Sequence, residues 1–132
     1  VLDGTVDVIA TDHAPHSAEE KAKGLAGSLM GVVGLETAFG VLNTKLVKTG
    51  IITLEKLIDM MSVKPREIFG LPGGKIEVGA PADLALLDVD KKWCVNPENF
   101  VTMGRATPFK NWNLQGENLL TICKGEIVYA AI

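Results

Sequence analysis

The fold is decided by the stretch Val-Ile-Ala-Thr-Asp-His-Ala-Pro-His, which occupies residues 8–16. With Val6, its first residues form a short and mostly β-branched run that has turn-forming residues on both sides. Such a run is typical of a strand covered on both faces, as in a parallel sheet. We therefore expect a strand over residues 6–11 that ends at Asp12, where side chains capable of chemistry begin.

Helical periodicity follows this strand. Residues 13–33 are irregular and contain several glycines, which predicts a long loop of the kind that is often functional. We expect a first helix from Gly34 to Gly50, whose inward stripe is Leu35, Ala38, Phe39, Leu42 and Leu46. A second helix should begin after Thr53 as N-cap and end near residues 61–62, and a short third helix should run from Pro65 to Gly70.

The pattern changes to short strands after residue 70. Strands are expected at residues 75–78, 84–88, 93–95, 119–123 and 126–129, and an irregular segment at 96–118. Lys124-Gly125 reads as a tight connection between the last two strands. The fold class predicted for the whole chain is α/β.

Several motifs, in order, resemble the dihydroorotases of the amidohydrolase superfamily. After the opening stretch come Ala-Glu-Glu-Lys (18–21), Val-Gly-Leu-Glu-Thr-Ala-Phe (33–39), a glycine-led run at 74–88 and Thr-Ile-Cys-Lys-Gly-Glu-Ile-Val-Tyr (121–129). The resemblance covers essentially the whole chain. It implies that residues 1–70 are the last strand and helices of a (β/α)8 metal-dependent hydrolase barrel, and that residues 71–132 are part of a small β-sandwich subdomain.

The resemblance also implies an activity. Dihydroorotases reversibly convert N-carbamoyl-L-aspartate to dihydroorotate in pyrimidine synthesis, with one or two zinc ions. Other cyclic-amide hydrolases, such as a hydantoinase or an allantoinase, remain alternatives, as does a non-catalytic relative that acts as a scaffold for a transcarbamoylase. The chain has 132 residues, about half of the roughly 250 that such a barrel takes. We expect a C-terminal fragment, inactive alone, whose other zinc ligands and the discriminating His-x-His pair lie upstream.

Four residues are the candidates for the site. Asp12 stands where a barrel strand ends, and the resemblance makes it a metal ligand and proton carrier, although an aspartate after a strand can also serve only as a loop cap. The resemblance assigns substrate contact to His16 and to the main chain at Met30 and Gly31. His13 should point away from the site by strand alternation, and we expect it to stabilise the loop or the residues behind the site.

Composition narrows the partners. The formal net charge of −3 gives no reason to expect nucleic acid or an anionic membrane as a partner. No apolar run approaches the roughly 20 residues that span a bilayer. Cys94 and Cys123 lack metal-site spacing, and we expect buried free thiols in a cytoplasmic protein. The resemblance implies a small-molecule substrate, further copies of the chain and aspartate transcarbamoylase as partners.

Overall fold

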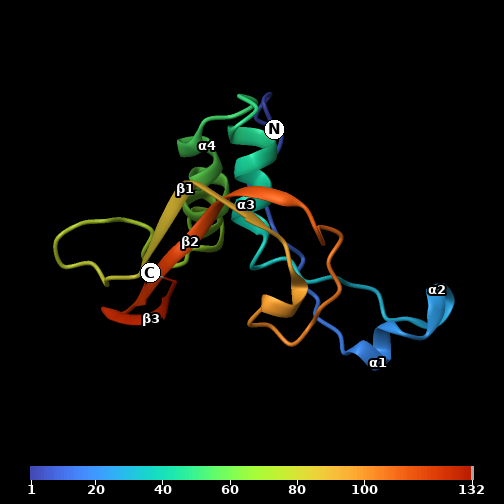
Figure 1. Cartoon of the computed structure of the whole chain (residues 1–132). Coiled ribbons are helices and arrows are strands. Elements are labelled where there is room, and N and C mark those ends of the chain that lie inside the picture. The colour runs from blue at the N-terminus through green and yellow to red at the C-terminus, as the bar shows by residue number, and fades with distance from the viewer. Residues whose placement is uncertain (132) are drawn as a thin grey trace.

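The structure is a computed structural model, and it describes residues 1–131. Helical segments occupy the chain up to Phe69, and the three strands that follow form a C-terminal sheet (Figure 1). The elements are α1 (Ala18–Lys21), α2 (Gly24–Gly27), α3 (Ala38–Leu42), the π-helical η1 (Asn43–Val47), α4 (Leu54–Ile58), the π-helical η2 (Asp59–Val63), α5 (Lys64–Phe69), β1 (Leu84–Cys94), the 3-10 helix η3 (Pro97–Asn99), β2 (Asn113–Cys123) and β3 (Glu126–Ala130).

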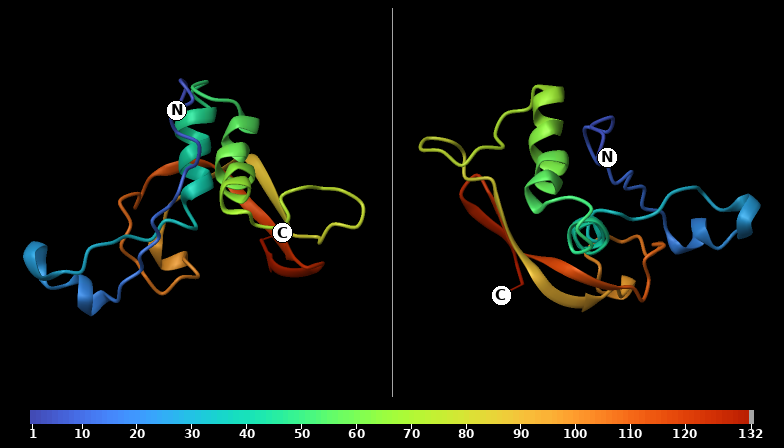
Figure 2. Two further views of the ribbon diagram at one scale, coloured as in Figure 1. Left: turned by 180° about the vertical axis from the view of Figure 1, so that it is seen from behind. Right: turned by 90° about the horizontal axis from the view of Figure 1, so that it is seen from above.

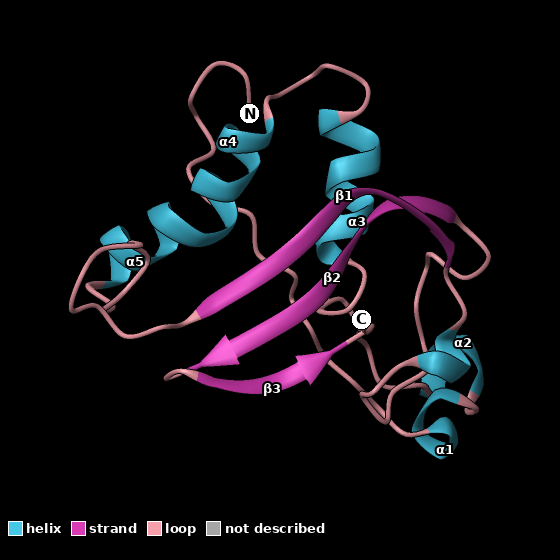
Figure 3. Ribbon diagram, turned by 60° about the vertical axis from the view of Figure 1, so that its left-hand side comes forward, coloured by secondary structure: helices cyan, strands magenta, loops and turns pink. Residues whose placement is uncertain are grey.

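Two helical arms pack beside one sheet. The first arm is α3 with η1, and the second is α4, η2 and α5; both lie on the same side of the three strands (Figure 3). The short helices α1 and α2 project away from the arms and the sheet at one end of the molecule (Figure 2). None of the helices described in residues 1–131 combines the length and the apolar character that crossing a bilayer requires.

The second helical arm begins as predicted and then differs. The Thr53 hydroxyl accepts a hydrogen bond from the Lys56 N–H at 3.2 Å, which confirms the N-cap. The predicted break before Pro65 is wrong, because helical segments follow one another from Leu54 to Phe69. Lys64 N–H donates to Asp59 O, so a π turn precedes the proline and the chain continues past a residue that cannot donate. Gly70 ends the arm at φ 61°.

The sheet is antiparallel, with strand order β1-β2-β3 (Figure 3). Two predicted strands, 84–88 and 93–95, are joined in β1, and β2 begins at Asn113 within a segment that was expected to be irregular. The reason is mutual pairing, since Trp93 is opposite Leu114 and Leu84 is opposite Ile122. The strand predicted at 75–78 is absent from the described residues, and this segment is exposed.

The opening strand is also absent. Residues 6–11 have no strand assignment, and the Ile9 N–H donates instead to Met60 O at 3.1 Å. A strand forms only where neighbours accept and donate along it. The part of the chain that the structure describes offers one parallel bridge there, between His13 and Val32.

The apolar core lies between the arms, the sheet and the loops. Leu57 and Met60 are fully buried in the second arm. A second cluster unites Val33 with Val95, Phe100 and Leu114, so residues from both sides of position 70 pack together. The division into domains at that position stays a prediction. Cys94 and Cys123 are free thiols but exposed, against the expected burial, because each stands at a strand end.

Candidate active site

Asp12 lies in an unusual backbone conformation. Its φ of 47° is in the left-handed region, which aspartate and asparagine tolerate better than most residues. The side chain is exposed to solvent. Because the chain turns at Asp12, the alternation that predicted an outward direction for His13 does not apply there. Asp12 therefore presents a solvent-accessible carboxylate at a turn, close in sequence to both histidines.

The three predicted substrate-binding residues come together. His16 Nε2 lies 2.7 Å from Met30 O, and because a carbonyl can only accept, His16 donates through Nε2. An added Cβ on Gly31 would lie 3.2 Å from the same Nε2. Met30 is thus hydrogen-bonded to His16 and Gly31 lies beside the ring, although neither residue makes a hydrogen bond to Asp12. The hydrogen bond to Met30 O therefore stabilises the loop, and His16 is also a candidate substrate ligand.

Two further side chains hold this loop. Lys21 Nζ donates to Leu29 O at 2.8 Å and to Gly31 O at 3.0 Å. Glu20 closes a capping box by accepting from the Ser17 N–H at 2.8 Å and from its hydroxyl at 3.0 Å. These bonds from Ser17 lower the pKa of the Glu20 carboxyl below its ordinary value. Sequence reasoning assigned no role to Lys21, although the Ala-Glu-Glu-Lys motif that contains it was noticed.

The loop and the opening stretch approach each other backbone to backbone. Ala14 N–H donates to Val32 O at 2.9 Å. Gly31 has φ 129°, and a Cβ there would lie 2.6 Å from Ala14 Cβ and 2.8 Å from Ala14 O. A Cβ on Gly34 would lie 3.0 Å from Thr11 O. The two glycines therefore permit an approach that side chains would prevent.

Residues 101–106, in the connection between β1 and β2, also bind the loop and the residues that follow it. Val33 N–H donates to Ala106 O at 2.9 Å. The Glu36 carboxylate accepts from the main-chain N–H groups of Val101 at 2.8 Å and Thr102 at 3.1 Å. The loop between β1 and β2 is in this way fastened to the start of the first helical arm.

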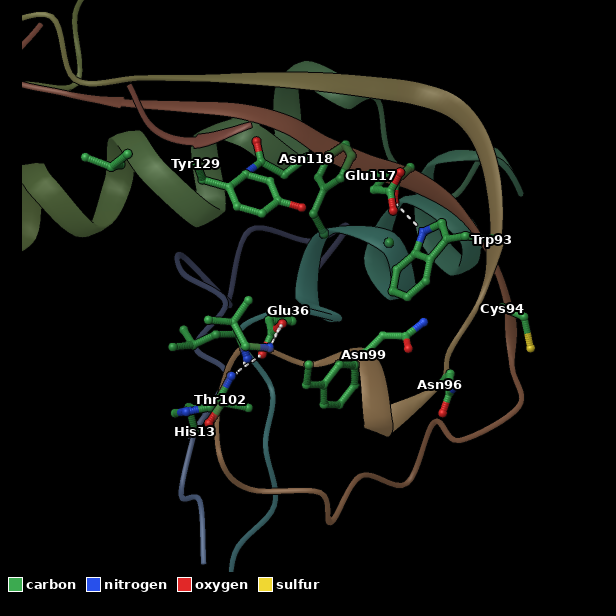
Figure 4. A pocket seen from close by; sticks show the side chains of 17 residues that line it. His13, Glu36, Trp93, Cys94, Asn96, Asn99, Thr102, Glu117, Asn118 and Tyr129 are labelled. Carbon is green, nitrogen blue, oxygen red and sulfur yellow. Dashed lines mark hydrogen bonds between the residues drawn. The ribbon is translucent and has the colours of Figure 1, made fainter. Parts of the chain in front are cut away.

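A cavity lies next to these contacts. It has a volume of about 680 Å³ between α3, β2, β3 and the loop after β1, and is mainly apolar. In Figure 4, His13, Glu36 and Thr102 gather on one side of it, with Tyr129 and Trp93 farther away. Asp12 and His16 do not line it, so the cavity and the predicted substrate residues are separate features.

A complete zinc site does not fit the side chains of this chain alone. Among residues 1–131, no group of three His, Cys, Asp or Glu side chains is close enough to hold a metal ion. A catalytic zinc normally takes three protein ligands. Asp12 has the right ligand chemistry but would be one ligand of several, and the other ligands of such a site are not among the described residues.

Comparisons with known proteins place these features in a family. The chain is 52% identical over 127 residues to a dihydroorotase of Brevibacillus brevis and 50% identical over 129 residues to that of Bacillus caldolyticus. These matches cover 96% and 98% of this chain but 30% of either relative, so the chain spans under a third of their length.

A solved structure agrees with the sequence comparison. The L-hydantoinase (dihydropyrimidinase) of Arthrobacter aurescens superposes with a TM-score of 0.87 at 32% identity, covering 97% of this chain and 30% of that one. The small antiparallel sheet beside helices is thus a partial barrel-and-sheet arrangement of this fold. The sequence model of one family matches residues 1–128, almost the whole length, and on that match the chain belongs to the amidohydrolase family.

Proposed function

We propose that this chain is the C-terminal part of a dihydroorotase, which interconverts N-carbamoyl-L-aspartate and dihydroorotate. The observation that carries the proposal is the identity of 50–52% to dihydroorotases over nearly the whole chain, against 32% to the L-hydantoinase. The contact of His16 with the Met30–Gly31 loop supports it, because it gathers the residues that the resemblance assigns to the substrate.

Asp12 has the proton-transfer role in this proposal. Its exposed carboxylate can accept a proton when water or another nucleophile attacks the amide carbon, and can return that proton to the leaving nitrogen. The substrate would be held by His16 and by main-chain groups of Met30 and Gly31. The Nε2–H of His16 is engaged by Met30 O. Binding of a substrate carboxylate there would therefore add to or replace that bond.

The proposed cofactor is zinc, one or two ions per complete enzyme. Since the described residues contribute only Asp12, most ligands would lie outside this chain. We predict that the isolated 132-residue chain shows neither turnover nor tight zinc binding. Titration calorimetry with zinc, with an assay of carbamoyl-aspartate cyclisation alongside, checks this.

The test of the proposed function uses two Asp12 variants of the complete enzyme, meaning this chain together with the remainder that its relatives possess. Asp12→Asn keeps the shape but cannot accept a proton, and should lower kcat by about 10²–10⁴-fold. Asp12→Ala should remove nearly all turnover and reduce the zinc content. Cyclisation of N-carbamoyl-L-aspartate and bound zinc are measured on the same samples.

Asp90→Asn provides the control, because Asp90 is an exposed carboxylate that pairs with Lys48 away from the site. It should retain wild-type turnover. Near wild-type rates for Asp12→Asn would contradict the proton role, and a wild-type enzyme that did not cyclise carbamoyl-aspartate would contradict the function itself.

A second candidate is a different cyclic-amide hydrolase, which the TM-score of 0.87 to the L-hydantoinase favours. Turnover of hydantoin or allantoin in preference to dihydroorotate would support it. A non-catalytic scaffold for a transcarbamoylase would process none of the three substrates while still binding that partner.

The proposed setting is the cytoplasm, where both free thiols of the chain would stay reduced. The proposed assembly is a homo-oligomer, with aspartate transcarbamoylase as a possible further partner. Light scattering of the complete enzyme, alone and mixed with the transcarbamoylase, tests both associations.

A further inference from the structure

His13 makes contacts that the proposed reaction does not use. Its Nδ1 accepts from the Gly34 N–H at 3.0 Å and lies 3.4 Å from the Leu35 nitrogen. An imidazole nitrogen that accepts carries no hydrogen, so the ring hydrogen is on Nε2. Gly34 is buried, and main-chain donors that are buried require a partner. The His13 ring is the partner that the structure gives to this donor.

The contact joins the two segments that form the candidate site. His13 follows Asp12 directly, and Gly34 follows the substrate-binding loop by three residues. The Ala14–Val32 hydrogen bond of 2.9 Å is a second connection between the same segments. One connection would leave the loop free to pivot, whereas two connections fix how far it lies along the opening stretch.

The glycines of the loop show how closely it approaches the opening stretch. A Cβ on Gly34 would lie 3.0 Å from Thr11 O, and one on Gly31 would lie 2.6 Å from Ala14 Cβ. A side chain at either position would push the loop away from the opening stretch, so the two glycines permit the close approach and the His13 bond holds the loop there. The glycines thus allow the short distance between the loop and the opening stretch, and the hydrogen bonds of His13 and Ala14 maintain it.

We propose that His13 is a positioning residue: through Nδ1 it holds the main chain of Gly34, and thus sets the Met30–Gly31 loop in register with Asp12. This rests on the proposed function, in which that loop binds substrate. His13 itself touches neither the substrate nor the reacting atoms.

Two variants of the complete enzyme separate positioning from plain packing. Asn is the conservative replacement, because its Oδ1 can accept near the place of Nδ1. His13→Ala leaves the Gly34 donor without its partner. The loss of one such hydrogen bond should raise KM about tenfold, with kcat within about threefold of wild type and zinc content unchanged. In His13→Asn, KM should return most of the way to the wild-type value.

Hydrogen exchange supplies a readout that does not depend on turnover. In His13→Ala, the peptide that contains Gly34 and Leu35 should exchange faster, and in His13→Asn it should return towards the wild-type rate. Thr53→Ala is the matched control, because it also removes a side-chain acceptor of a main-chain N–H, at 3.2 Å, but in the second helical arm. It should change neither KM nor exchange at Gly34.

The outcomes are distinct. Equal KM values for wild type and His13→Ala, equal damage in the Ala and Asn variants, or unchanged exchange at Gly34 would each overturn the proposal. A wild-type enzyme without dihydroorotate turnover would overturn the proposed function instead. Exchange at Gly34 would then still decide whether His13 holds the loop.

Discussion

Two regions of the molecule are held together by different means. The helix–sheet junction, residues 40–44 packed on residues 115–116, depends on buried side chains. Asn43 is fully buried, and its Nδ2 donates to Val89 O at 3.0 Å and Gln115 O at 2.9 Å. The site segments, residues 12–16 and 30–34, depend on main-chain hydrogen bonds and on glycines that allow close approach.

The difference indicates where stability and geometry are controlled. In the junction, the Thr44 hydroxyl accepts from the Gln115 N–H at 2.7 Å. Asn43 and Thr44 together therefore provide hydrogen-bond partners for both main-chain groups of Gln115 in β2. The Asn43 amide nitrogen is paired in this junction while its buried Oδ1 has no hydrogen-bond partner among the described residues, and paired donors in a buried network rigidify a core. In the site segments, Asp12 is exposed and the local packing is backbone against backbone. We expect junction mutations to change unfolding and site mutations to change kinetics.

The largest effect on stability is expected for Asn43→Ala. The change leaves Val89 O and Gln115 O without their donor and opens a small void, which should lower the free energy of unfolding by about 2–4 kcal/mol. KM and kcat should stay near wild type. Denaturant unfolding of the complete enzyme measures the free energy of unfolding. Asn99→Ala, at an exposed position, is the control, and its free energy of unfolding should change by no more than about 0.5 kcal/mol. An equal loss in both variants would remove the distinction between the regions.

A second prediction concerns Gly31→Ala. The new methyl would lie 2.6 Å from Ala14 Cβ in a backbone at φ 129°, so the loop must shift away from the opening stretch. KM should rise at least about tenfold, since backbone strain of this kind costs about 1–3 kcal/mol. Gly24→Ala is a matched control, because Gly24 also has positive φ, 72°, but has no atom within 4 Å of an added Cβ. Equal kinetics of the two variants would show that the close approach does not matter.

His16→Ala should have a smaller effect. It removes the contact of 2.7 Å with Met30 O and the proposed substrate ligand, so KM should rise about fivefold to tenfold while zinc content stays constant. Steady-state kinetics and metal analysis on one preparation check this. Loss of zinc with an unchanged KM would instead assign His16 to the metal.

The smallest effect is expected from acid at the capping box. Because the folded pKa of Glu20 is lowered by its bonds from Ser17, the box is intact above the ordinary pKa of a glutamate and is lost as the pH falls through the lowered value. Helix α1 should fray at its N-terminus at low pH, without global unfolding. The carboxyl shift of Glu20 followed by NMR shows the step, and Ser17→Ala should bring the pKa back towards its ordinary value.

Local signals in the sequence predicted local structure well. The Thr53 cap, the Gly70 stop and the Lys124–Gly125 turn are all confirmed, because each depends on the conformational preference of one or two residues.

The remainder depended on contacts distant in sequence. The strand at residues 6–11 needed neighbours that the described residues do not supply, and β2 began early because β1 extends opposite it. The bonds of Asn43 join it to residues 46 and 72 positions away, which no periodicity indicates. The roles assigned to Asp12 and His16 stay predictions.

The positive φ of Asp12 has an evolutionary consequence. At 47° the backbone admits glycine, asparagine and aspartate readily, whereas a residue such as glutamate or alanine would add roughly 1–2 kcal/mol of strain. A descendant that lost the proposed proton carrier would therefore drift first to asparagine or glycine, by single-nucleotide changes that leave the turn intact. Sequences with either residue at this position, next to an unchanged His13, would mark lineages in which chemistry was lost before shape.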